Sequence, residues 1–144
     1  MGMAWTRPAR VMVDVAPWDL SGLWSLLFAA QRGMVTLALD VTADDDLSLT
    51  LAAMDVGEAL EDLEWIYPDL VDEAAAVDLG AAPLGDKSEC FAAVQDLISG
   101  AFSRAVAELR NTELDRSDGD VLGLARIVHL LSHASDRLTH RRSR

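Results

Sequence analysis

Two long helical patterns in the C-terminal half constrain the fold of this chain more than any other feature. Apolar residues recur at helical spacing from about Lys87 to Asn111 and again from about Asp120 to Thr139. This repeat is typical of amphipathic helices with one buried face. The polar segment between them, 112–118, is short, and a short connection places consecutive helices side by side in opposite directions. We therefore expect an antiparallel helix pair at the end of the chain.

The N-terminal part of the chain gives a different signal, because apolar and polar residues alternate there in three places. Alternation with a period of two is typical of β-strands. The three alternating segments are Arg10–Val15, Val35–Val41 and 47–53.

A helical pattern from Asp19 to Arg32 lies between the first two of these segments, and Gly33 is its expected end. The polar segment Thr42–Asp46 separates the other two, which predicts a β-hairpin over residues 35–53. An alternative is that 35–53 is helical, because the acidic residues 44–46 favour a helix N-terminus. We prefer the hairpin.

Two further helices are expected after the hairpin, at 55–67 and 70–79, with Pro68 ending the first. The predicted fold is therefore α+β and predominantly helical: strand, helix, hairpin, and then four helices ending in the antiparallel pair. An all-α bundle is the alternative.

The 144 residues are enough for one domain. We expect residues 1–9 to form a loose N-terminal arm and residues 140–144 to form a basic, disordered tail.

The charge of the chain limits its partners. The formal net charge is −12, and between Gly33 and Asp86 there are fourteen acidic residues and no Lys or Arg. Such a surface repels phosphate groups, which argues against direct binding of nucleic acid or of an anionic membrane. The single cysteine, Cys90, cannot form an internal disulfide, which favours a cytoplasmic protein.

An acidic row on the helix expected at 55–67 is the leading candidate for a binding surface. Its members are Glu58, Glu61, Asp62 and Glu64, and Trp65 follows directly. Tryptophan is enriched among the residues that anchor protein interfaces, and carboxylates attract a basic partner. The leading hypothesis is therefore a non-enzymatic protein–protein interaction module, such as an adaptor, an immunity-type inhibitor or a chaperone-like protein. The alternative interpretation of this row is an ordinary solvated helix face.

A second hypothesis is a metal site on the last helix. His129, His133 and Asp136 follow the spacing His-x3-His-x2-Asp, which places all three on one helix face. Two histidines four residues apart can bind zinc or another divalent metal. The same residues also fit the polar side of an amphipathic helix, and in that interpretation the protein has no cofactor.

A third hypothesis is a small-ligand sensor with an apolar pocket between the expected sheet and the helices. The chain contains no Gly-x-Ser-x-Gly, no Cys-x2-Cys and no phosphate-binding glycine loop. These absences favour a protein that is not an enzyme. A homodimer through the terminal helix pair also stays open.

Overall fold

A computed structural model describes residues 5–40, 47–73, 79–80, 88–111 and 117–142 of the chain. Within these ranges the secondary structure is helical and contains no strand. The helices are α1 (Thr6–Val15), α2 (Leu20–Asp40), α3 (Leu47–Ile66), the single turn α4 (Leu70–Glu73), α5 (Ser88–Arg110) and α6 (Asp118–Arg142).

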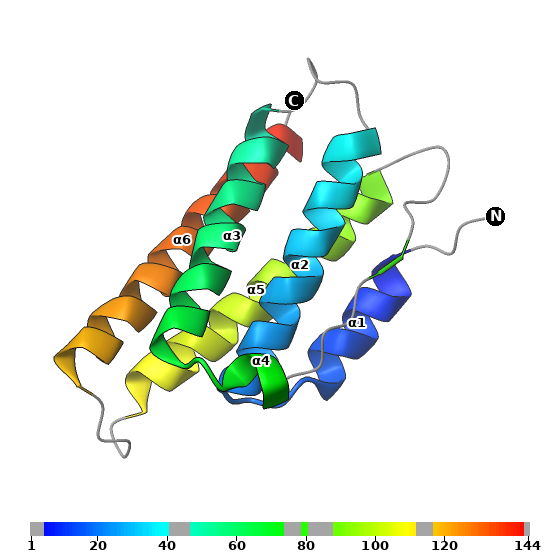
Figure 1. Ribbon diagram of the computed structural model, residues 1–144. Helices are drawn as coiled ribbons and strands as arrows, with labels where there is room; N and C mark the ends of the chain where they lie inside the picture. The colour runs from blue at the N-terminus through cyan, green and yellow to red at the C-terminus, as the bar shows by residue number, and fades with distance from the viewer. Residues whose placement is uncertain (1–4, 41–46, 74–78, 81–87, 112–116, 143–144) are drawn as a thin grey trace.

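Four of the helices form a bundle, shown in Figure 1. Helix α2 packs against α3 and α5, and α6 packs against the same two helices from the opposite side. Each helix runs antiparallel to its two neighbours in the ring. Helix α1 lies outside the ring against α5, and α4 contacts α2. The predicted antiparallel pair at the end of the chain is confirmed as α5 and α6.

The predicted α+β fold is wrong, and the all-α alternative is what the structure shows. The strand expected at Arg10–Val15 lies inside α1. The inward side of α1 includes Ala9, Met12 and Val13, at the spacing of a helix face. The alternating valines suggested a strand because Val11 and Val15, which are exposed in the structure, happen to be apolar.

The hairpin expected at 35–53 is also absent from the part of the chain that the structure describes. Helix α2 continues to Asp40 and buries Met34 and Leu37 on its inner side. Val35 and Leu39 lie on its outer side and are exposed. Because the helix has apolar residues on two opposite sides, its sequence imitates the alternation of a strand.

The second half of that expected hairpin lies in α3. Leu49, Ala52 and Val56 are fully buried at intervals of three and four residues, which is helical spacing. Leu47, which the strand interpretation grouped with Leu49, is exposed. Residues 42–46, the expected turn, lie outside the described residues.

Gly33 does not end a helix, contrary to expectation, but allows a close contact in the middle of α2. A Cβ atom at this position would lie 3.2 Å from Val94 Cγ2 and 3.5 Å from Trp5 Cζ3. The missing side chain therefore makes room for Trp5, whose side chain is 1% exposed.

The expected loose arm and basic tail are both largely helical where they are described. Residues 1–4 lie outside the described residues, Trp5 is buried, and α1 begins at Thr6. At the other end α6 continues to Arg142, and residues 143–144 lie outside the described residues.

Helix α5 holds α1 at both ends with charges of opposite sign. The backbone N–H and the hydroxyl of Thr6, the first residue of α1, donate to Glu89 Oε1. At the other end of α1, Arg104 Nη2 donates to the carbonyl oxygens of Val13 and Ala16 at 2.7 and 2.8 Å. A carboxylate at the N-terminus and a guanidinium at the C-terminus both complement the dipole of a helix. The position of α1 is therefore fixed by electrostatics as well as by its apolar face.

Asp19 caps the N-terminus of α2 and makes the stability of the folded protein depend on pH. Its Oδ1 accepts from the Ser21 hydroxyl at 2.6 Å and from the Gly22 N–H at 3.0 Å. The Ser21 hydrogen bond, assisted by the backbone N–H groups, lowers the pKa of Asp19 against an opposing effect of burial. A carboxyl whose pKa is lowered on folding stabilises the folded state above its unfolded pKa, and this contribution is lost as the pH falls through the lower value.

We therefore expect wild type and Asp19→Asn to differ in free energy of unfolding by a constant amount at neutral pH. Asparagine is a comparable helix cap without a charge. The difference should shrink as the pH falls below about 4, near the ordinary pKa of aspartate. Urea unfolding of both proteins between neutral pH and acid measures it. A difference that stays constant down to the lowest pH would show that the capping carboxylate does not act through its charge.

Candidate functional site

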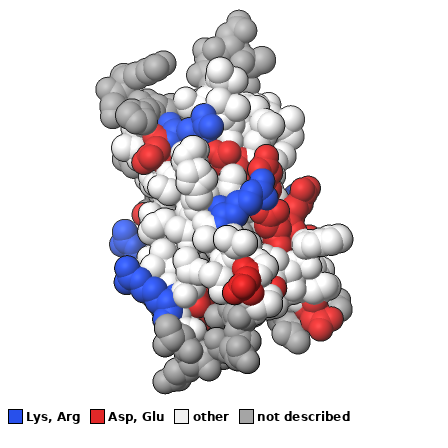
Figure 2. All heavy atoms as spheres, turned by 90° about the vertical axis from the view of Figure 1, so that its left-hand side faces the viewer, with Lys and Arg blue, Asp and Glu red and all other residues white. Residues whose placement is uncertain are grey.

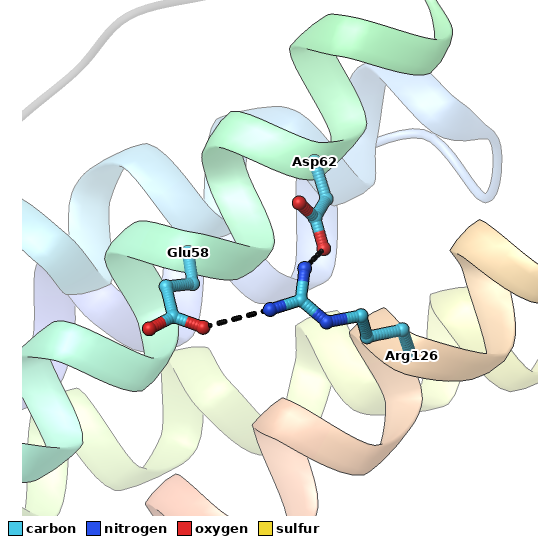
Figure 3. A network of polar contacts seen from close by, with 3 residues as sticks. All are labelled: Glu58, Asp62 and Arg126. Atoms are coloured by element: carbon cyan, nitrogen blue, oxygen red, sulfur yellow. Dashed lines mark hydrogen bonds and ion pairs between the residues drawn. The ribbon is translucent and has the colours of Figure 1, made fainter.

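The acidic row predicted as a partner-binding surface lies on α3, but two of its carboxylates are occupied within the molecule. Arg126 on α6 places its guanidinium between Glu58 and Asp62, as Figure 3 shows. Arg126 Nη2 lies 3.0 Å from Glu58 Oε2, and Nη1 donates to Asp62 Oδ2. One cation of the bundle therefore pairs with two of the four carboxylates.

A third carboxylate of the row also has an internal partner. Glu64 Oε1 accepts a hydrogen bond of 3.0 Å from the indole N–H of Trp24, which is buried in the core. Another ion pair, between Arg137 and Asp55, joins α6 to α3 at 2.9 Å. On the face that contains α3 and α6, Figure 2 shows basic atoms lying directly beside acidic ones. Three of the four carboxylates of the row thus have a partner within the bundle, two of them across the α3–α6 contact.

Glu58, Glu61 and Trp65 are the exposed members of the predicted site, and of these Glu61 and Trp65 have no side-chain partner among the described residues. Glu61 is exposed and has no hydrogen bond or ion pair with the described part of the chain. Trp65 is 87% exposed. Residues four apart on a helix lie on the same face, so the carboxylate and the indole are neighbours.

A groove between α2 and α3 is lined in part by Glu61, which lies one turn of α3 before Trp65. We call it the α2–α3 groove; its volume is about 450 Å³, and the residues that line it include Val35, Leu39, Met54, Gln31, Glu58 and Glu61. Leu39 is 84% exposed and Met54 57% exposed. Large apolar side chains gathered on one exposed surface are typical of an interaction site.

The two ends of the α2–α3 groove differ in chemistry. Because α2 and α3 are antiparallel, the C-terminal end of α2 lies beside the N-terminal end of α3. Leu39 and Met54 therefore belong to an apolar end, and Gln31, Glu58 and Glu61 to a polar, acidic end. The sequence carried a signal for this groove, namely the alternation in residues 35–41, but that signal was interpreted as a strand.

Gln31, which lines the groove, has an unsatisfied polar atom. Its Oε1 is buried and accepts no hydrogen bond within the described residues. It lies close to Gly57 on α3, where a Cβ atom would be 3.1 Å from Gln31 Nε2. A buried acceptor without a donor costs about 1–3 kcal/mol.

The predicted metal ligands lie on the outer face of α6. His129 and His133 are exposed, and their ring centroids are 4.2 Å apart. Asp136 is exposed on the same helix, but the described residues contain no cluster of three or more His, Cys, Asp or Glu side chains suited to a metal. The side chain of His140 is not among those described. The zinc site stays a prediction. Two imidazoles alone do not make a complete set of zinc ligands.

No family model matches this chain, and the searches of curated proteins and of solved structures found no significant match. Helix α2 is long and apolar enough to cross a membrane over Leu20–Leu39, but 61% of its most apolar window is buried inside the bundle. A core helix of a bundle has the same properties, so the cytoplasmic location stays a prediction. The small-ligand hypothesis loses its expected pocket, because the described residues form no sheet.

Proposed function

We propose that this protein is a non-enzymatic protein-binding module that holds a segment of a basic partner protein in the α2–α3 groove. The observation that carries the proposal is an exposed apolar groove with a free carboxylate, Glu61, at one end. Adaptors, immunity-type inhibitors and chaperone-like proteins all work by holding a partner in this way. The binding surface shares only Glu58 and Glu61 with the acidic row expected from sequence, because Asp62 and Glu64 contact partners on α6 and α2.

Two properties of the groove support this proposal. Exposing Leu39 and Met54 to water is unfavourable by about 25 cal/mol for each square ångström of apolar surface, and a partner would remove that cost. The charged residues that line the groove, Glu58 and Glu61, are both acidic. A basic segment is therefore favoured over a neutral or acidic one.

The proposal is tested by selecting displayed random peptides of about 16 residues, roughly four helical turns, against the purified protein. We expect enrichment of peptides that combine apolar residues with Lys or Arg. The selected peptides, once synthesised, should bind the Leu39→Gln variant about tenfold more weakly than wild type, or by about 1.4 kcal/mol, because the substitution removes an apolar side chain from the groove wall. Fluorescence polarisation measures both dissociation constants.

Leu122→Gln is the matched control for this experiment. Leu122 is a 71% exposed leucine on α6, outside the groove. Affinity should be unchanged in this variant, and circular dichroism should show both variants folded. The proposal is contradicted if no peptide is enriched, or if Leu39→Gln binds the selected peptides as tightly as wild type does.

A further inference from the structure

We infer that the segment held in the α2–α3 groove is an amphipathic helix whose arginine binds between Glu61 and Trp65, about two helical turns from its apolar anchors. This inference rests on the proposed function and specifies the partner of the same groove. Its evidence comes from the shape of the groove and from the free groups at its acidic end.

The shape of the groove favours a helical occupant. Its walls are two antiparallel helices, and a third helix packs into such a groove by interlocking ridges of side chains. An extended peptide usually binds by adding a strand to a sheet edge. The described residues contain no sheet that could receive one.

The apolar end of the groove provides the anchoring contacts. Leu39, Val35 and Met54 line it from both walls. The flexible thioether of methionine adapts to side chains of different shape. Helical ligands in such grooves present apolar residues three or four positions apart, so two successive apolar residues on one face match this end.

The acidic end offers two groups that suit an arginine better than a lysine. The carboxylate of Glu61 can accept paired hydrogen bonds from a planar guanidinium. The indole of Trp65, on the same face of α3, offers a surface on which that guanidinium can stack. The ammonium of lysine lacks both the fork geometry and the flat face.

The spacing within the ligand follows from the geometry of α3. Glu61 is seven residues from Met54, which is about 10 Å along a helix. The ligand arginine must therefore lie about two turns from the apolar residues that contact Met54.

A second copy of this chain is a weaker candidate for the occupant. If the grooves of two copies faced each other, the two Glu61 carboxylates would lie close together and repel each other. The two chains, each with a net charge of −12, would also repel each other. The described part of the groove supplies no cation to offset this repulsion, since Arg126 is already paired with Glu58 and Asp62.

The test uses helical peptides of about four turns with two leucines four residues apart. In the two spaced peptides an arginine lies seven residues from the nearer leucine. One peptide has the arginine on the N-terminal side of the leucines, and the other has it on the C-terminal side. A shuffled peptide of the same composition moves the arginine to the opposite face. A lysine peptide keeps the spacing. We expect one spaced peptide to bind about tenfold more tightly than the shuffled one, with the lysine peptide in between.

Two protein variants locate the effect, and a third is the control. Glu61→Lys should abolish the advantage of the spaced peptide, whereas Asp14→Lys, an exposed carboxylate on α1, should leave it unchanged. Trp65→Ala should bring the affinity of the arginine peptide down to that of the lysine peptide. Glu61 and Trp65 are both exposed, so substituting them should not unfold the protein.

The outcomes separate this inference from the proposed function. If spaced and shuffled peptides bind equally and both require Leu39, the groove holds partners and the arginine inference is wrong. If every peptide binds independently of Leu39, or none binds, the proposed function fails as well. If sedimentation equilibrium shows self-association that Leu39→Gln removes, the occupant is a second copy, and the arginine inference is overturned.

Discussion

Arg104→Met is expected to lower the free energy of unfolding by about 3–5 kcal/mol, a large part of the stability of a domain of this size. Arg104 is 1% exposed and donates to four carbonyl oxygens of the backbone. These belong to Val13, Ala16, Pro17 and Gly100, at distances from 2.7 to 3.1 Å. Methionine fills a similar volume but donates no hydrogen bond, so the C-terminus of α1 would lose its capping donors.

The surroundings of Arg104 explain why a buried cation is tolerated here. Its Cζ lies 4.4 Å from the ring centroid of Trp18, which covers it on one side. Burial lowers the pKa of Arg104, while the nearby Asp19 carboxylate acts in the opposite direction. Arginine nevertheless remains protonated at any pH at which proteins are normally studied.

Urea unfolding followed by tryptophan fluorescence measures the change in free energy of unfolding in Arg104→Met. In thermal unfolding the melting temperature of this variant should fall by roughly 10 °C or more. Arg104→Lys is the matched control, since it retains the charge but not the planar set of donors. We expect it to fall between wild type and Arg104→Met. Equal stability of wild type and Arg104→Met would show that the hydrogen bonds of Arg104 do not stabilise the contact of α1 with α5.

Gly22→Ala is expected to destabilise the protein by about 2–4 kcal/mol, although alanine is normally the better helix residue by about 1 kcal/mol. A Cβ atom at this position would lie 1.8 Å from the carbonyl oxygen of Pro17 and 2.8 Å from its carbonyl carbon. These are backbone atoms, so either the first turn of α2 or the carbonyl must move. The sign of the effect is therefore set by a tertiary contact and not by helix propensity.

The control for this substitution is Gly119→Ala in the first turn of α6. A Cβ atom there would meet nothing closer than Ser117 Oγ at 3.9 Å. We expect this variant to be as stable as wild type or slightly more stable. Thermal unfolding by circular dichroism compares the two alanine variants, and equal melting temperatures would contradict the expected clash.

Gly22 and Arg104 act on the same atom, because Arg104 Nε donates to the Pro17 carbonyl that approaches Gly22. Their substitutions should therefore not be additive. In the double variant the destabilisation should be smaller than the sum of the two single effects, since the carbonyl is then free to move.

Among the elements, those with a single apolar face could be predicted from sequence. The antiparallel pair was recognised because α5 and α6 each repeat apolar residues along one stripe. The beginning of α2 after Asp19 and the end of α3 before Pro68 also match, because capping and the missing N–H of proline are local effects. The alternation of apolar and polar residues wrongly predicted a strand in α2, because this helix has apolar residues both in the core and in the groove.

The candidate site depended on contacts that no local pattern contains. The acidic row was identified by composition, but Asp62 and Arg126 are 64 positions apart in the chain, and Trp24 and Glu64 are 40 apart. Only the packing of α2 and α6 against α3 decides which carboxylates are neutralised and that Glu61 is free.

The sequence by itself thus determined the helical hairpin at its end, the acidic character of its middle and the caps of individual helices, because each depends on neighbours within a few positions. The tertiary structure decided that the alternating segments are helical, that α1 is held by Glu89 and Arg104, and that an apolar groove stays open between α2 and α3. These features depend on which helix faces meet, since a side chain is buried, paired or free only in relation to elements far away in the chain.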